Sequence, residues 1–141
     1  MDIVLEYKAG IAMLFMRIIL GFLFLMQGYD KVFRLGLKKT EEGIEFAMRG
    51  SKLPGSLIKM IAVISSFVEL LGGIMLVAGF LIYPALVLLG IDLVIVVFGM
   101  SLREPLWNMS FVWPRLVLLL ALLLLPAAWD RFSIDHFYSF L

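Results

Sequence analysis

The chain alternates long apolar stretches with shorter polar links. Crossing the ~30 Å hydrocarbon core of a bilayer takes about 20 mostly apolar residues in a helix. Stretches of that length lie at residues 10–29, 57–79, 81–102 and 111–129. The pattern predicts an all-α, integral membrane four-helix bundle that forms one transmembrane domain over residues 1–141.

The first link is longer than a simple hairpin needs and has a helical pattern of its own. Thr40 can cap a helix, and Glu45 and Arg49 are spaced i,i+4. Gly50 followed by Pro54 can end that helix. We therefore expect a short interfacial helix that starts at Thr40 and lies on the lipid headgroups or covers the mouth of the bundle. The alternative is a solvated connector whose lysines hold the protein to anionic lipid.

Basic residues concentrate at this first link. Cytoplasmic loops of membrane proteins are enriched in Lys and Arg, and that bias sets the orientation. The link between the second and third helices has no basic residue, and the tails have only Lys8 and Arg131. We expect the first link to face the cytoplasm and both termini to lie on the opposite side. Seven basic residues at or beside the first link support this orientation: Lys31, Arg34, Lys38, Lys39, Arg49, Lys52 and Lys59.

Composition agrees with a membrane protein. Hydrophobic residues make up 63% of the chain and charged residues only 16%, which exceeds what a soluble domain of this size can bury. The net charge of +1 gives no reason to expect a nucleic-acid partner. The chain has no cysteine, phosphate loop, dinucleotide fingerprint or HExxH motif. We therefore expect no intrinsic cofactor, no metal site and no catalytic activity from the chain alone.

Each apolar stretch contains an ionisable residue near its middle. Such a charge costs on the order of 3 kcal/mol at a helix centre, so we expect it to face the bundle interior and to be paired. The four residues are Arg17, Glu69, Asp92 and Arg115. From their depths we predict that Arg17 pairs with Glu69 and that Arg115 pairs with Asp92, although exchange of partners stays open. The pairs either specify only the helix arrangement or also bind a ligand or relay protons.

Small residues share helix faces with these charges. Positions three, four or seven apart lie on one face of a helix. Since small residues favour close helix contacts and charge avoids lipid, these faces should converge on the bundle axis. The predicted stripes are Arg17, Gly21, Phe24, Gly28 and Lys31; Ala62, Ser65, Glu69, Gly73 and Leu76; and Ala85, Asp92 and Gly99.

The first stripe lies in the segment RIILGFLFLMQGYDKVF (17–33). This segment resembles the first-helix signature of the DoxX family of small membrane proteins. EFAMRGSKLP (45–54) and FVELLGGIMLVAGF (67–80) are similar to the family's loop helix and second helix, and DRFSIDHF (130–137) is similar to its tail. The residues that match the first signature are Arg17, Leu20, Gly21, Phe24, Gly28, Lys31 and Phe33.

The sequence departs from the family pattern at two places. Gln27 stands where many members have His, and Arg115 stands near a position that is often acidic, in the segment WNMSFVWPR (107–115). The single histidine, His136, is in the tail. These differences argue against transferring His-based metal or proton chemistry to this chain.

The resemblance implies a four-helix protein of the bacterial cytoplasmic (inner) membrane, which in some members is a subunit linked to quinone-dependent sulfur or thiol oxidation. The leading hypothesis is an accessory or anchor subunit of a quinone-linked oxidoreductase or another membrane assembly. Its partners would be membrane lipids and either other membrane-protein subunits or further copies of the chain. The alternatives are a small-molecule or lipid binding or transport protein that uses the midplane charges, and a ligand-free structural subunit.

Three polar residues at the end of the first predicted helix are candidates for binding a lipid headgroup or a quinone ring. They are Gln27, Asp30 and Lys31, beside the Arg17 stripe and under the expected loop helix. A bound quinone or lipid would be the only cofactor of this chain. The alternative role of these side chains is to reach the polar membrane surface.

Overall fold

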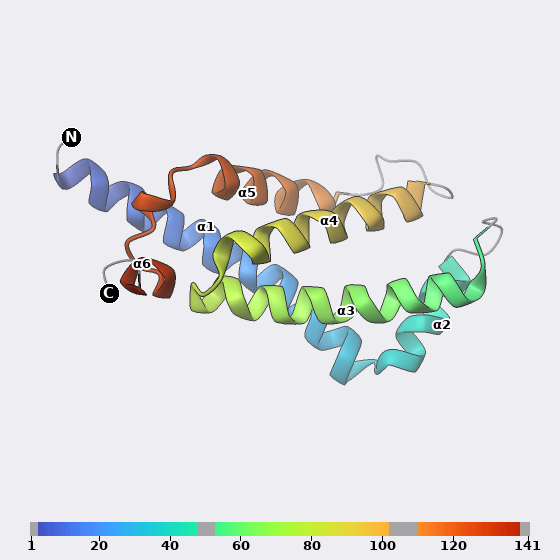
Figure 1. The fold of residues 1–141 in the computed structure, drawn as a ribbon. Helices are drawn as coiled ribbons and strands as arrows, with labels where there is room; N and C mark the ends of the chain where they lie inside the picture. Colours follow the sequence, from blue (N-terminus) through green and yellow to red (C-terminus); the bar gives the residue numbers. More distant parts are fainter. Residues whose placement is uncertain (1–2, 48–52, 102–109, 139–141) are drawn as a thin grey trace.

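The computed structural model describes residues 3–47, 53–101 and 110–138, and these residues form helices and turns without a β-strand (Figure 1). The predicted all-α class is therefore confirmed. The long helices are α1 (Ile3–Tyr29), α3 (Gly55–Ala78) and α4 (Ile82–Ser101), followed by the shorter α5 (Val112–Leu124). The remaining elements are a π-helical turn, η1 (Asp30–Arg34), the loop helix α2 (Leu37–Ala47), a 3₁₀ turn, η3 (Ala127–Trp129), and α6 (Ile134–Tyr138).

Within the described residues, three helices are long and apolar enough to cross a membrane: α1 with η1, α3 and α4. The predicted fourth span, residues 111–129, is only partly helical. Helix α5 has 13 residues, so it is about 20 Å long, less than the ~30 Å of a hydrocarbon core. It ends because Leu125 precedes Pro126 and has a ψ of 144°, and a residue before proline is forced out of the helical conformation.

The link between α1 and α3 contains a helix, but Thr40 does not cap it as predicted. The chain reverses at Gly36, which has a φ of 82° that glycine tolerates. Helix α2 therefore starts at Leu37, and Thr40 lies inside it. The Thr40 hydroxyl instead donates a hydrogen bond to the Lys31 carbonyl oxygen (3.0 Å). Some predictions fall on residues outside the described ranges. They are the Glu45–Arg49 pair, the helix end at Gly50, the basic residue Lys52 and the last residue of the predicted span 81–102.

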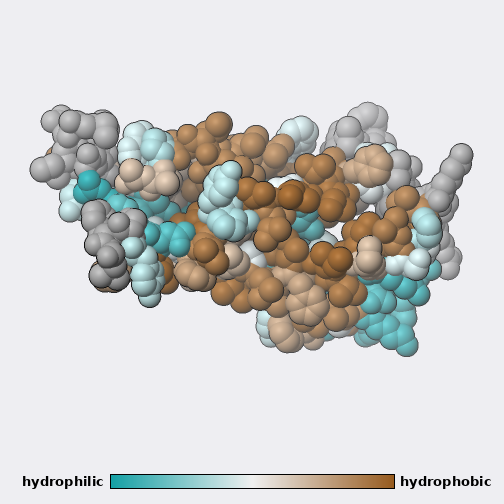
Figure 2. Space-filling view, in the orientation of Figure 1, coloured by the Kyte–Doolittle hydropathy of each residue, from teal (hydrophilic) through white to brown (hydrophobic). Residues whose placement is uncertain are grey.

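Different elements form the two ends of the molecule. The start of α1 and helix α6 lie at one end, and α2 lies at the other (Figure 1). Helix α1 packs most extensively against α3, while α5 packs against α1 and α4. Figure 2 shows a broad apolar band between hydrophilic residues at the two ends, as expected for a protein whose middle faces lipid.

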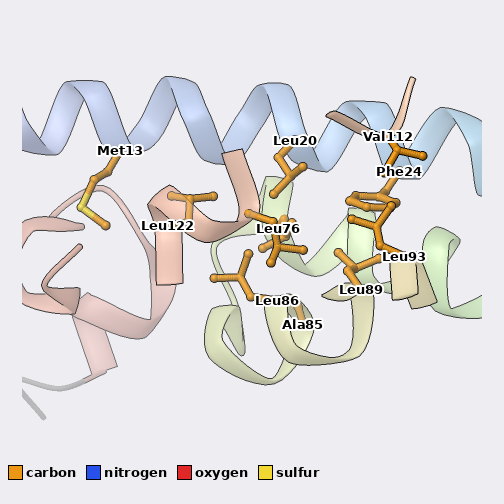
Figure 3. Packing of buried hydrophobic residues seen from close by; sticks show 11 residues of the cluster. Met13, Leu20, Phe24, Leu76, Ala85, Leu86, Leu89, Leu93, Val112 and Leu122 are labelled. Carbon is orange, nitrogen blue, oxygen red and sulfur yellow. The ribbon is translucent and has the colours of Figure 1, made fainter. Parts of the chain in front are cut away.

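The apolar core lies where α1, α3, α4 and α5 meet (Figure 3). Lipid tails are as apolar as leucine, so helix packing in a bilayer depends on close van der Waals contact rather than on hydrophobic burial. The core consists of Met13, Leu20, Phe24, Leu76, Ala85, Leu86, Leu89, Leu93, Val112, Leu119 and Leu122.

Glycines bring the backbones of α1 and α3 into contact. A Cβ atom at Gly73 would overlap the backbone of Leu25, and one at Gly28 would overlap the backbone of Leu70. Both glycines belong to the small-residue stripes predicted for these helices. The stripes therefore mark the α1–α3 interface, and this interface leaves no room for larger side chains.

We predict that Gly73→Ala lowers the free energy of unfolding by about 1–3 kcal/mol, because the added methyl group must push two backbones apart. The measurement is denaturation of the purified protein in mixed micelles. Gly43→Ala is the matched control, because a Cβ atom there meets nothing within 4 Å and alanine favours the helix. Equal destabilisation by the two substitutions would contradict this account of the interface.

Candidate functional site

Of the four ionisable residues of the apolar stretches, Arg17 lies apart from the other three, and Glu69 interacts electrostatically with Asp92 and Arg115. Arg17 and Glu69 are each 1% exposed, and Asp92 is 5% exposed, whereas Arg115 is half-buried. Glu69 belongs to an ionic centre toward the α2 end, and Arg17 belongs to another near the C-terminal tail. The predicted pair Arg17–Glu69 is therefore wrong.

The first ionic centre joins α3 to the end of α1. Lys31 Nζ lies 2.6 Å from Glu69 Oε2, and Gln27 Nε2 donates a hydrogen bond of 2.7 Å to Glu69 Oε1. Gln27 and Lys31 are one helical turn apart, so both can reach the same carboxylate. Gly28 lies between them and lets α3 approach closely. We refer to Gln27, Lys31 and Glu69 as the glutamate centre.

The backbone around Lys31 is held from two sides. Lys31 lies in the π-helical turn η1, a type of turn that occurs frequently at functional sites. Its carbonyl oxygen accepts the hydrogen bond from Thr40 of α2. Next to it, Arg34 Nη1 lies 3.3 Å from Asp30 Oδ1 in an exposed ion pair. The loop helix thus fixes the position of the lysine that neutralises Glu69.

A cavity of about 410 Å³ opens beside the glutamate centre. This volume is within the usual range of ~300–1,000 Å³ for small-molecule sites. Gln27, Lys31 and Ser65 supply its polar side chains, and its walls are otherwise glycines and apolar residues of α2, α3, α4 and the adjoining turns. The other lining residues are Gly43, Ile44, Leu53, Leu57, Ile58, Ile61, Ala62, Ile95, Val96, Phe98, Gly99, Met100 and Phe111. We call this space the inner cavity.

A wider groove of about 770 Å³ follows the outer side of α1. Gln27 and Lys31 line it as well, together with Asp30 and Arg115. The three residues predicted to bind a headgroup therefore all line this groove, and two of them also line the inner cavity. Gln27 and Lys31 stand between the two spaces.

Arg17 holds the C-terminal tail in the second ionic centre. Its Nη2 donates a hydrogen bond of 2.8 Å to the Phe132 carbonyl oxygen, and its Nε lies 3.7 Å from Asp130 Oδ2. Arg17 lies ten residues before Gln27, or about 15 Å along the helix, so it is not level with the glutamate centre. Burial raises the pKa of the Asp130 carboxyl above its ordinary value, and the Arg17 guanidinium opposes that rise.

The tail also joins the turn between α3 and α4. Asp135 accepts hydrogen bonds of 2.8 Å from the backbone N–H groups of Leu81 and Ile82. Leu81 has a φ of 49°, which costs a non-glycine residue roughly 1–2 kcal/mol. A Cβ atom at Gly79 would overlap the Arg17 guanidinium. One short tail thus contacts both the strained turn and the buried arginine.

The predicted pair Arg115–Asp92 is not among the contacts of the described residues. Arg115 Nη1 donates to the Phe111 carbonyl oxygen of its own helix start (2.6 Å), and its guanidinium lies 5.7 Å from the centre of the Phe24 ring. Asp92 lies beside Ser65 of α3. Arg115 is on the first turn of α5, within reach of the carbonyl oxygen that precedes its own helix.

Sequence reasoning missed Asp130, Ser133 and Asp135 as structural partners. They follow the last apolar stretch, in a segment for which the sequence pattern predicts no contact with the helices. The resemblance of DRFSIDHF (130–137) to a family segment was the available signal. Among the described residues, no group of three or more His, Asp or Glu side chains is placed to hold a metal ion.

A family model described as DoxX matches residues 12–101. The chain belongs to the DoxX family. The matched range includes Arg17 and the whole glutamate centre, whereas Arg115 and the tail lie beyond it. Comparison with the curated proteins and with the solved structures gave no match.

We predict that double-mutant cycles will couple Glu69 to Lys31 and not to Arg17. Glu69→Ala should destabilise the protein by about 3 kcal/mol, because it leaves the largely buried Lys31 without its counterion. The Lys31/Glu69 cycle should give a coupling energy of about 0.5–3 kcal/mol, and the Arg17/Glu69 cycle should be additive within ~0.5 kcal/mol. Unfolding free energies in mixed micelles provide both cycles. The opposite ranking would restore the pairing expected from the sequence.

Proposed function

We propose that this DoxX-family membrane protein is an accessory or anchor subunit of a quinone-linked oxidoreductase in the bacterial inner membrane, and that its inner cavity holds the ring of a quinone-like lipid. The observation that carries this proposal is the position of the glutamate centre at the polar end of an apolar cavity. Pockets with a few fixed polar groups and apolar walls are typical of cofactor sites.

The polar end of the inner cavity offers hydrogen bonds that suit both forms of a quinone. Lys31 has three N–H donors, one of which points to Glu69. A remaining donor can bind a quinone carbonyl oxygen. The carbonyl oxygen of the Gln27 side chain can accept a hydrogen bond from a quinol hydroxyl, because Gln27 uses its Nε2 group toward Glu69. The aliphatic walls of α3 and α4 can contact an isoprenoid tail.

The redox chemistry itself would belong to the ligand and to a partner subunit. The chain has no cysteine, and none of its described residues form a metal-ligand group. Its role would be to hold the lipid and to dock the partner, so the isolated chain should not turn over a substrate. The competing scaffold role needs no ligand, and the next experiment separates the two.

We predict that Ile61→Trp displaces co-purified quinone from the protein. Ile61 lines the inner cavity, so the larger indole occupies the ligand's space without removing the glutamate centre. Ile64→Trp is the matched control on the same helix, because Ile64 is 54% exposed and does not line the cavity. Mass spectrometry of extracted lipid, per mole of folded protein, gives the readout.

Removing the positive charge of Lys31 tests the polar end of the inner cavity in the same assay. Lys31→Ala should lower quinone retention about tenfold or more, because it removes a charge-assisted hydrogen bond. Lys39→Ala removes an exposed charge of α2 and should not change retention. If all four variants keep the wild-type quinone content and partner activity, the protein is a ligand-free structural subunit.

We also propose that the α2 end faces the cytoplasm. The chain has no native cysteine, so single cysteines at exposed positions report the sidedness of each end. An impermeant maleimide should label Tyr138→Cys in intact cells and label Lys38→Cys only after the inner membrane is opened, because the basic loop stays inside. Labelling of Lys38→Cys alone in intact cells would show the inverted orientation.

A further inference from the structure

A second cavity lies at the end of the protein opposite the inner cavity. It has a volume of about 420 Å³ and lies between the start of α4, the end of α5 and the tail. Its walls are largely apolar and include Met13, Leu86 and Leu122. The tail supplies four polar side chains to this cavity, and Tyr83 of α4 supplies a further hydroxyl group. The four tail residues are Asp130, Ser133, Asp135 and His136. The proposed function uses none of these residues.

Asp130 differs from its neighbours in this tail cavity. It is 4% exposed, yet neither carboxyl oxygen has a hydrogen-bond partner among the described residues. Ser133 Oγ donates to the Asp130 carbonyl oxygen (2.8 Å) and accepts from the His136 N–H (3.1 Å). Asp135 accepts its two hydrogen bonds from the start of α4. Asp130 is therefore a buried carboxylate of the tail cavity whose oxygens accept no hydrogen bond from the described residues.

The charge of Asp130 already has a counterion. Arg17 Nε lies 3.7 Å from Asp130 Oδ2, a distance that provides electrostatic attraction but is too long for a hydrogen bond. A second cation at Asp130 would be repelled by the Arg17 guanidinium. The carboxylate thus requires hydrogen-bond donors rather than positive charge, and leaving buried acceptors unpaired is unfavourable.

We propose that the tail cavity binds a neutral apolar molecule through a phenol-type hydroxyl that donates a hydrogen bond to Asp130. The apolar walls of α4 and α5 contact the body of the ligand, and the carboxylate selects its O–H group. An O–H donor to a carboxylate forms one of the stronger hydrogen bonds available in a protein. The site depends on the tail, because Asp130 reaches the cavity only while Arg17 holds the tail in place.

The test uses 1-naphthol as the probe and naphthalene as its partner without a hydroxyl group. Each compound is titrated into the purified full-length protein in detergent, and the unfolding temperature is followed, since a ligand that binds only the folded state raises it. We expect 1-naphthol to raise the unfolding temperature in a saturable way and naphthalene to bind at least about fivefold more weakly, because it lacks the hydrogen bond.

Two variants locate the site. Asp130→Asn should weaken 1-naphthol binding at least about fivefold, because a neutral amide oxygen is a poorer acceptor than a carboxylate. Leu123→Trp fills the tail cavity and should abolish the shift, whereas Leu120→Trp, at an exposed position of α5 that does not line the cavity, should leave it unchanged.

Equal shifts from 1-naphthol and naphthalene in the wild-type protein would overturn the proposal, because no hydroxyl would then be recognised. Unchanged 1-naphthol binding by Leu123→Trp would also overturn it. These two results decide the question even if Asp130→Asn fails to fold. Quinone retention in the inner cavity should be the same in Leu123→Trp and wild type, so failure at one cavity is distinguishable from failure at the other.

Discussion

An ionised side chain inside an apolar bundle must find its partners within the protein, because lipid offers none. This constraint organises the whole molecule. Glu69 takes its partners from the end of α1, so that the π-helical turn and α2 are fixed against α3. Arg17 takes its partners from the tail, so that a segment 115 residues away in sequence closes the other end. The two ends of the fold are each built around one buried charge.

The close contact of α1 and α3 makes these charge interactions possible. Gly28 and Gly73 bring the backbones together, which places Glu69 within reach of both Gln27 and Lys31. A wider separation would lengthen both contacts and leave the carboxylate without compensation, which is costly in a low-dielectric interior. The small-residue stripe and the glutamate centre are thus parts of one interface, with packing setting the distance over which the charges interact.

Features that depend on composition and on the spacing of apolar and small residues can be predicted from the sequence. The long apolar helices, the small-residue stripes and the burial of Arg17, Glu69 and Asp92 follow from local pattern. The partners did not follow, because pairing depends on how far each helix is shifted along its neighbours and on where the tail returns. The length of the last helix was misjudged because Pro126 was treated as part of an apolar run. Thr40 is not the cap because the chain reverses earlier, at Gly36, and a glycine is a turn signal that competes with a threonine cap.

The separation of the two ionic centres bears on what the bundle can do. Arg17 and Lys31 lie on one helix, 14 positions apart in the sequence, or about 21 Å along the axis. A midplane transport site would gather charges at one depth and expose them to alternate sides of the membrane. Here the two ionic centres lie at different depths, and each is held by contacts that also hold the fold together. Exchanging these partners during a transport cycle would disrupt the packing at that end, so the arrangement argues against a midplane transport site and is compatible with the proposed role, in which the helices stay in place.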